Sequence, residues 1–383
     1  MTPYLIIFAI VAVLAFANMH ATRANKTVFV LLCVGIGVFV GISDMLGGYD
    51  RYIYCEVFEV QSRQVRAGAS IFNPQFMRFF GHEQVYGLIN TLIGYFTENR
   101  YVFVMVYTVI MYILLAFSIL RYTKDPFFAL MIFMGLMFFF SFTYLRQVMA
   151  AIILWFSLPY IAKRQYLPFF ALVLTATLVH NSAMYFALLY FIPRKKFPTQ
   201  NIIIVMGILL FIGIFFSAAS LFTFYGDVVE SAASKAAGYE NLASSDVRIA
   251  YIIESLLFLG ILFANYDRVG TSTSDCVITN AYLMFCGVLL LFCRSTDGGR
   301  IAWHSAIGVI LLITRLCEKR NTDLLRVFMI TVSFALFFRI LVAWGMLLSP
   351  YKTCFTPGHR EGDECYMHYE YNHQYDIDKF YNL

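Results

Sequence analysis

Long apolar runs follow one another along nearly the whole chain, and short polar or charged segments separate them. A run of about 17–25 apolar residues is what an α-helix needs to cross the hydrocarbon core of a bilayer. The pattern predicts an all-α fold, a polytopic helical membrane protein with about ten full spans. We place the spans near residues 3–19, 27–42, 101–121, 126–144, 146–162, 201–218, 249–265, 277–293, 301–316 and 324–348.

The apolar segment "YLPFFALVLTATLVHNSAMYFALLYFIP" (166–193) needs separate treatment, because basic clusters flank it at both ends. Its two ends therefore belong on the same face of the membrane. Its length suits either two short spans or a re-entrant pair of half-helices, with "HNS" (180–182) at the turn. A re-entrant turn would place His180 at membrane depth, where irregular backbone is tolerated only if it lines a polar cavity.

The short connections between the predicted spans carry clusters of lysine and arginine. Short loops rich in these residues stay in the cytoplasm, and ten spans place all of the clusters on one side. The clusters are Arg23/Lys26, Arg121/Lys124, Lys163/Arg164, Arg194/Lys195/Lys196, Arg268 and Arg315/Lys319/Arg320. Both termini and the long segments 43–100 and 219–248 then lie outside. We expect one transmembrane domain over 1–348 and an acidic extracytoplasmic tail over 349–383.

Composition excludes a water-soluble protein. Hydrophobic residues make up 60% of the 383 residues and charged residues only 13%, which is about half the charge of a typical soluble domain. The eight cysteines show no CxxC or Cys/His spacing, so no metal or redox motif is predicted.

Several ionisable or polar side chains lie near the predicted outer ends of spans, where the positive-inside trend leaves few arginines. The ionisable ones are Asp44, Asp50, Arg51, Glu56, Glu83, Arg100, Arg146, Arg248, Arg294, Asp297 and Arg300, with His180 and His304 nearby, and Tyr144 and Gln147 flank Arg146. Charged residues at such depth normally face the bundle interior or a water-filled cavity, and they are functional candidates. Arg146 and Gln147 are the clearest case, because they join two spans with almost no loop.

Arginine is well suited to a phosphate ligand, because its planar fork binds phosphate bidentately and keeps its charge at any working pH. Outer arginines around a cavity suit a lipid-linked phosphate or pyrophosphate, with an Asp, Glu or His beside them as a general base. Plainer readings stay open. Any single arginine could snorkel to the interface, Asp50 and Arg51 could form a surface ion pair, and His180 and His304 could be structural.

Four stretches follow one another in order: "GYDRYIY", "EQVYGLINTLI", "YLRQVMAAIILWFSLPYIAKRQY" and "ATLVHNSAMYFALLYFIP". In this order they resemble the EpsG branch of the Wzy-type polysaccharide polymerases. That branch shows an acidic residue with tyrosines, a Glu opening a short helix, an Arg-Gln pair at the start of a span, and a His-x-Ser-Ala element. The later "GGRIAWH" and "SPYKTCF" resemble its distal elements. The similarity covers residues 40–195 well and 294–355 loosely.

The resemblance implies a GT-C-like fold and an inner-membrane glycosyltransferase that acts on the periplasmic or outer face. Its partners would be oligosaccharide repeat units carried on undecaprenyl pyrophosphate, with membrane lipid and a chain-length regulator as further candidates. It would use no nucleotide sugar, cofactor or metal, and it would bind no nucleic acid.

The resemblance also implies roles for the outer residues. Arg146 and Arg300 would stabilise the pyrophosphate leaving group electrostatically. Acceptor activation would fall to His180 or to a carboxylate such as Asp50 or Glu83. The remaining substrate-binding candidates are Gln147, Arg294, Arg51, Tyr144 and His304.

Three other functions stay open. A flippase or transporter for lipid-linked glycans would need two-sided access and internal symmetry, whereas the polar residues gather on one face and no repeat is evident. A membrane-bound sugar acyltransferase would need acyl-CoA access from the cytosol. A ligase of the O-antigen type is chemically closest, because it differs only in the acceptor.

Topology is directly testable. We expect the segments 121–125, 163–165, 194–200 and 315–323 to face the cytoplasm, because they carry the basic clusters. A cysteine introduced by Lys195→Cys should react with a membrane-impermeant maleimide only in inverted vesicles, whereas a cysteine placed within 231–245 should react in intact cells. Labelling of position 195 from outside would contradict the hairpin and move every later span to the other face.

Overall fold

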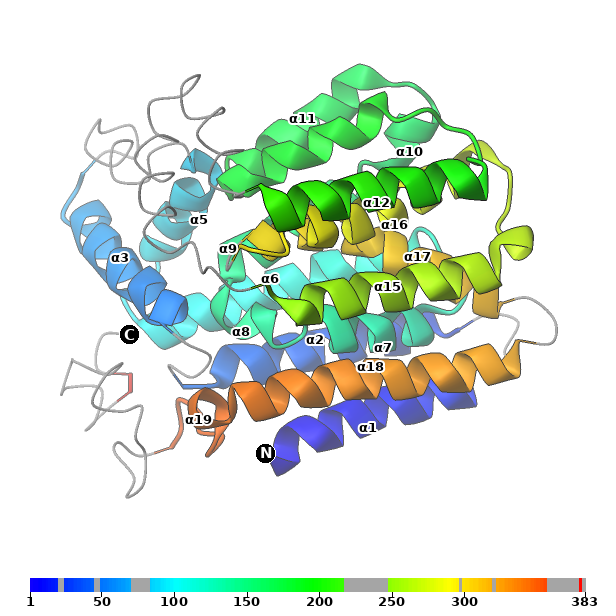
Figure 1. Cartoon of the computed structure of the whole chain (residues 1–383). Coiled ribbons are helices and arrows are strands. Elements are labelled where there is room, and N and C mark those ends of the chain that lie inside the picture. The colour runs from blue at the N-terminus through cyan, green and yellow to red at the C-terminus, as the bar shows by residue number, and fades with distance from the viewer. Residues whose placement is uncertain are drawn as a thin grey trace. The chain divides into compact units, whose positions relative to one another are not determined.

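A computed structural model describes residues 1–19, 24–44, 49–69, 83–216, 247–295, 298–318, 322–356 and 379–380. These residues form helices with short connections (Figure 1) and, within the described ranges, no β-strand; Ser43 and Thr353 form an isolated bridge. The chain divides into two compact units. Unit 1 comprises Met1–Phe156, Leu174–Met184 and Cys317–Leu383, and unit 2 comprises Ser157–Val173 and Tyr185–Leu316.

Unit 1 contains α1 (Thr2–Ala17), α2 (Lys26–Ile42), α3 (Tyr49–Arg66), α5 (Gln84–Gly94), α6 (Arg100–Leu120), α7 (Pro126–Met137), α8 (Phe140–Thr143), α9 (Leu145–Trp155), α18 (Asp323–Ala343) and α19 (Gly345–Leu348). Unit 2 contains α10 (Leu158–Ala162), α12 (Thr199–Phe215), α15 (Ile249–Ala264), η2 (Tyr266–Arg268), α16 (Thr273–Leu291) and η3 (Gly298–Ser305), with most of α17 (Ala306–Cys317). The boundary between the units passes through α11 (Tyr166–Thr177) and the 3₁₀-helix η1 (Asn181–Phe191).

A helix or a pair of consecutive helices lies at each of the ten predicted span positions. Among the described residues, five segments are long and apolar enough to cross a membrane by themselves: Arg100–Leu120, Leu145–Ala162, Thr273–Leu291, Gly298–Cys317 and Asp323–Ala343. The apolar helices at the other predicted positions are 10–17 residues long. The protein is therefore a helical membrane protein, and the number of crossings stays a prediction.

The segment 166–193 folds as two short helices, as predicted. The helix α11 ends at Thr177, and η1 begins at Asn181. The turn therefore covers Leu178–His180, slightly earlier than the predicted 180–182. Its depth in the membrane stays a prediction. The sequence also predicts an amphipathic helix over 47–68 and an apolar helix too short to span over 83–96. The structure confirms both, as α3 and α5.

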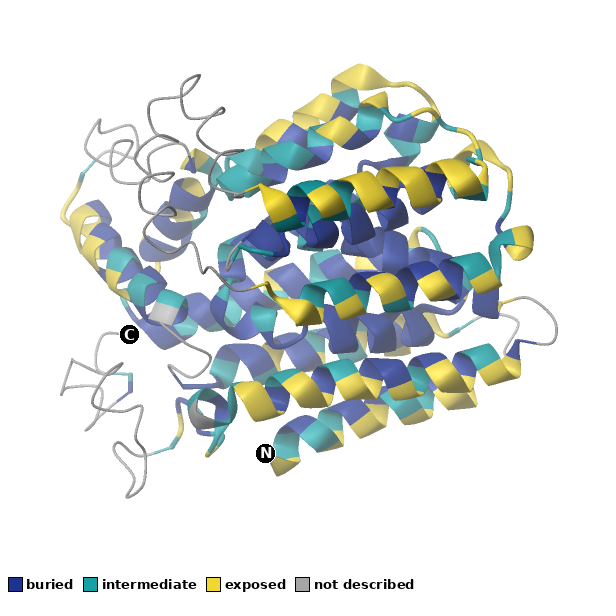
Figure 2. Ribbon diagram, in the orientation of Figure 1, coloured by how far each residue is buried: buried dark blue, intermediate teal, exposed yellow. Residues whose placement is uncertain are grey.

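In unit 1 the helix α7 is enclosed by other elements, and all twelve of its residues are buried. The helices α1 and α18 pack against it and carry exposed apolar side chains on their other faces (Figure 2). Gly135 on α7 lies against the backbone of α18, where a Cβ atom would come within 2.7 Å of the Ser333 carbonyl oxygen. A small residue is therefore required there.

A second close approach joins α2 to α6. Gly37 and Gly41 form a small-xxx-small pair, which lets two membrane helices approach closely. The Thr108 hydroxyl donates a hydrogen bond across the contact to the Gly37 carbonyl (3.0 Å). A Cβ atom on Gly41 would lie 2.7 Å from Met105 Cα.

Buried ion pairs hold other helices of unit 1 together. Arg100, at the start of α6, donates two hydrogen bonds to the Glu59 carboxylate on α3 (2.5 and 3.0 Å). Arg326 on α18 lies 2.6 Å from the Asp125 carboxylate, which caps α7. Removing one partner of such a pair leaves an uncompensated buried charge, at a cost of about 3–5 kcal/mol.

The described residues of the predicted tail also pack against unit 1. The buried Asp44 carboxylate accepts a hydrogen bond from the Tyr101 hydroxyl (2.7 Å). Two lysine ammonium groups lie near it, that of Lys352 at 3.8 Å and that of Lys379 at 3.3 Å. The acidic part of the tail, residues 357–378, lies outside the described residues.

In unit 2 the buried helix α16 contacts α12, α15, α10 and η3. Two polar side chains fix α15 on it. The Tyr282 hydroxyl donates to the Phe258 carbonyl (2.6 Å), and the Ser255 hydroxyl donates to the Cys286 carbonyl (3.1 Å). Arg315 on α17 pairs with Asp275 at the start of α16 (2.6 Å).

The contact between α2 and α6 generates a stability prediction. Gly41→Ala should lower the stability of the purified protein by about 1–3 kcal/mol, because the added methyl group overpacks the contact. Thermal unfolding in detergent measures the effect. Gly35→Ala is the matched control on the same helix, where a Cβ atom meets nothing within 4 Å. Equal stability of the two variants would contradict the close approach.

Candidate active site

Arg146 stands at a break between two helices. The helix α8 ends at Thr143, and Tyr144 (φ −90°, ψ 52°) leaves the helical conformation before α9 begins at Leu145. Arg146 is therefore the second residue of α9. The first N–H groups of a helix have no partners within it and carry partial positive charge. The local backbone and the arginine together favour an anion.

Glu83 is the ionic partner of Arg146. Its carboxylate is buried at the start of α5 and forms an ion pair with the Arg146 guanidinium through Oε2. Its Oε1 atom accepts a hydrogen bond from the backbone N–H of Asn181 (3.2 Å). The Leu178 carbonyl accepts from Val85 N–H (2.9 Å), which fixes the start of α5 on the same turn. One carboxylate thus connects α9 with the turn that carries His180.

Two tyrosines cover the guanidinium of Arg146. The Tyr54 ring centroid lies 4.4 Å from Arg146 Cζ, and the Tyr86 centroid lies 5.3 Å away. Both rings are buried, and a cation over an aromatic face is stabilised most when water is excluded. Burial raises the pKa of Tyr54 to about 12, so its hydroxyl stays protonated. The Nε atom of Arg146 is buried and has no hydrogen-bond partner among the described residues.

His180 and Gln147 meet through Ser182. The backbone N–H of Ser182 donates to His180 Nδ1 (3.3 Å), and Ser182 Oγ lies 2.8 Å from the same nitrogen. Gln147 Nε2 donates to Ser182 Oγ (3.3 Å). Because a backbone N–H can only donate, Nδ1 is an acceptor, and the neutral ring carries its proton on Nε2. In this arrangement the ring N–H of His180 is on Nε2.

The other predicted residues of unit 1 differ in their surroundings. Asp50 is half-buried, one turn before Tyr54 on α3, and Tyr144 lies beside Trp344 with ring centroids 6.1 Å apart. Arg51 is fully buried. Its hydrogen bonds go to backbone carbonyls, those of Val40, Phe142, Gly41 and Ser43. Arg51 therefore joins the end of α2, the start of α3 and α8.

Three predicted residues belong to unit 2. Arg294 follows α16 and donates a hydrogen bond to the Ile214 carbonyl at the end of α12 (3.0 Å). Arg300 and His304 lie on the 3₁₀-helix η3, where Arg300 is half-buried and His304 is buried. They belong to a different unit from Arg146.

The sequence pattern did not single out Tyr54, Tyr86 or Ser182. A usable signal existed for each. Tyr54 lies four residues after Asp50 on an amphipathic helix, Tyr86 lies three after Glu83, and Ser182 is the serine of the His-x-Ser element.

Among the described residues, no three His, Cys, Asp or Glu side chains are arranged to hold a metal ion.

The structure defines a helical membrane protein in which a half-buried arginine, paired with a buried carboxylate and covered by tyrosines, lies beside a histidine turn. The chain belongs to the EpsG family, whose model matches residues 26–353 and so includes every candidate residue named above. Membership makes it a membrane protein of the polysaccharide-polymerase type. Neither the curated proteins nor the solved structures contain a match.

Proposed function

We propose that this protein is a glycosyltransferase that polymerises oligosaccharide repeat units carried on undecaprenyl pyrophosphate, on the outer face of the bacterial inner membrane. Membership of the EpsG family supports the class of reaction. The observation that carries the assignment of the site is the Arg146–Glu83 pair beside the His180 turn.

Arg146 binds the pyrophosphate in this proposal. The leaving pyrophosphate gains negative charge in the transition state, and a preorganised guanidinium stabilises that charge. The tyrosines and Glu83 hold the Arg146 side chain in place before substrate arrives. The positive end of α9 adds to the same effect.

Glu83 is the proposed general base. In the resting protein its carboxylate neutralises Arg146. When a pyrophosphate takes over the guanidinium, the carboxylate loses its strongest partner and becomes available to accept a proton from the acceptor hydroxyl. Substrate binding would thus activate the base. Asp50, which lies one turn before Tyr54 on α3, is the alternative general base.

His180 acts as a hydrogen-bond donor rather than as a base. Its Nδ1 atom accepts from Ser182, so a neutral ring offers an N–H to a substrate oxygen. Either a pyrophosphate oxygen or the acceptor sugar could receive it. Gln147 supports this arrangement through Ser182.

The proposed reaction balances without a cofactor. The bond between the anomeric carbon of the growing chain and its pyrophosphate oxygen breaks, and the bonding electrons leave with the polyprenyl pyrophosphate. A new bond forms between that carbon and the hydroxyl oxygen at the nonreducing end of a new repeat unit. The hydroxyl proton passes to Glu83. Arg294, Arg300 and His304 are proposed to bind substrate, with Arg300 on a pyrophosphate.

Substitution of Arg146 tests the proposal. Arg146→Lys keeps the charge opposite Glu83 but loses the bidentate fork, so polymer yield should fall about 10- to 100-fold. Arg146→Ala should abolish polymer, leaving single repeat units and accumulated lipid-linked substrate. The assay is a deletion strain complemented by each variant, with glycan length read on gels and membrane abundance on blots.

The control is Arg66→Ala on the outer segment α3, because the exposed Arg66 contacts Glu98 at 3.6 Å and such surface pairs contribute little. Arg300→Ala should reproduce the Arg146→Ala phenotype. Full-length polymer from Arg146→Ala at wild-type abundance would overturn the assignment. A transferase of the ligase type would instead leave polymer length normal and stop its attachment.

His180 variants separate a donor from a base. A glutamine places an amide N–H near the position of Nε2, so His180→Gln should keep activity within roughly tenfold of wild type. His180→Ala should lose roughly 100-fold, the usual effect of removing one such donor. The initial rate of polymer formation in membrane vesicles measures both. Equal inactivity of the two variants at equal abundance would show that His180 accepts a proton.

A further inference from the structure

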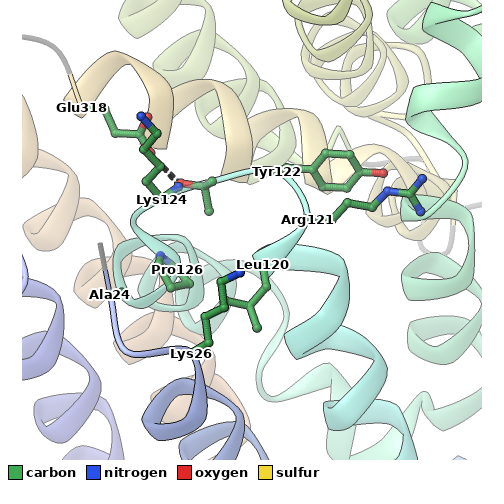
Figure 3. A pocket seen from close by; sticks show the side chains of 9 residues that line it. Ala24, Lys26, Leu120, Arg121, Tyr122, Lys124, Pro126 and Glu318 are labelled. Carbon is green, nitrogen blue, oxygen red and sulfur yellow. Dashed lines mark hydrogen bonds between the residues drawn. The ribbon is translucent and has the colours of Figure 1, made fainter. Parts of the chain in front are cut away.

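A hollow of about 410 Å³ lies where α2 and α7 begin and α6 ends. It lies at the opposite end of α6 from Arg100, and all of its lining residues belong to unit 1. Figure 3 shows its lining, in which Lys26 rises from the start of α2 toward Leu120, and Lys124 and Glu318 lie beyond Pro126. We call this feature the basic hollow.

Cations outnumber anions in the lining. Lys26, Arg121 and Lys124 face one carboxylate, that of Glu318, so the formal charge is 3 − 1 = +2. Lys26 and Lys124 are exposed, and their flexible ammonium groups can converge on an anion. In Figure 3 the head group of Arg121 points away from both lysines, which leaves Lys26 and Lys124 as the candidate ligands of an anion.

Glu318 organises the loop that carries Lys124. Its Oε1 atom accepts hydrogen bonds from the Thr123 hydroxyl (2.6 Å) and from the backbone N–H of Lys124 (3.3 Å). The carboxylate is therefore engaged with the loop, which stands between α6 and α7. The helix starts at the hollow are capped by Asn25 and Asp125, so an anion would meet side-chain cations rather than free backbone N–H groups.

The composition of the neighbouring helices and of the lining indicates that the hollow lies at a membrane boundary. Leu120, which lines it, is the last residue of a segment long and apolar enough to span. The apolar helices α2 and α7 begin beside it. Its lining also combines cations with the apolar side chains of Leu120 and Pro126. A basic site between helix ends at this level suits a lipid head group that carries a phosphate.

We propose that the basic hollow binds the phosphate of an anionic phospholipid head group through Lys26 and Lys124. The site is separate from the Arg146 site and does not depend on the proposed reaction. Under the predicted topology it faces the inner leaflet. A bound lipid would join the starts of α2 and α7 to the end of α6, where the chain itself supplies a surplus of positive charge.

Lipid titration of the full-length protein in a neutral detergent tests the inference. Phosphatidylglycerol is added, and bound lipid is counted by native mass spectrometry, with phosphatidylcholine as the net-neutral comparison. Each lysine near an anionic head group contributes about 1 kcal/mol, or about fivefold in affinity. Lys26→Ala and Lys124→Ala should each weaken phosphatidylglycerol binding about fivefold, and the double variant about 30-fold.

Two further variants sharpen the test. Glu318→Gln keeps an oxygen acceptor for the loop but raises the formal charge by one, so it should strengthen binding about fivefold. Lys163→Ala removes an exposed lysine that does not line the hollow and should leave binding unchanged. Unchanged thermal unfolding of all variants confirms that they fold.

Inorganic phosphate distinguishes the source of the anion. If millimolar phosphate fails to displace phosphatidylglycerol, the site is a lipid site, as proposed. Displacement by phosphate would assign the hollow to a soluble phosphate and overturn the lipid assignment. Wild-type affinity for phosphatidylglycerol in the double lysine variant would overturn the site altogether.

Discussion

A charge buried among membrane helices has to be paired within the protein, and the arrangement of unit 1 follows from that requirement. Removing an ion from water costs several kcal/mol, which only close opposite charges and hydrogen bonds offset. Arg100 therefore holds α6 to Glu59 on α3, and Arg326 holds α18 to the start of α7. The Arg51 guanidinium instead donates hydrogen bonds to four backbone carbonyls. Glycines such as Gly41 then allow the helices to approach within reach of these contacts.

The same requirement gives the proposed site its selectivity. Arg146 is already neutralised by Glu83 when no substrate is present. An incoming anion has to be a better partner than a buried carboxylate, which favours a multiply charged pyrophosphate over a weakly charged group. Tyr54 and Tyr86 stabilise the cation whichever anion it faces. The Arg146–Glu83 pair is thus the resting state of the site. A substrate anion displaces Glu83 only if it interacts with Arg146 more strongly than this carboxylate does.

The positions of the helices could be predicted from the lengths of the apolar runs, and α3 and α5 from their polar–apolar pattern. The partners of the charges could not. In the sequence Arg100 and Arg146 look alike, since each begins a span, yet Arg100 pairs with Glu59 on α3 and Arg146 pairs with Glu83 at the start of α5. Which arginine meets which carboxylate depends on the rotation of α3 and α5, which hydropathy does not encode. The tautomer of His180 depends on one backbone N–H of Ser182, which only three-dimensional geometry reveals.

The buried Asp44 has a consequence for biosynthesis. Its carboxylate lies 335 positions before Lys379 in the chain, and its other cation, Lys352, also comes late. A ribosome adds roughly 5–20 residues per second, so Asp44 exists for many seconds before either ammonium group has been made. During that interval, closing the end of α2 over the carboxylate costs more than it does once the two ammonium groups are present, so Asp44 has to stay hydrated. Packing at the Asp44 end of unit 1 is therefore completed only when synthesis has almost finished.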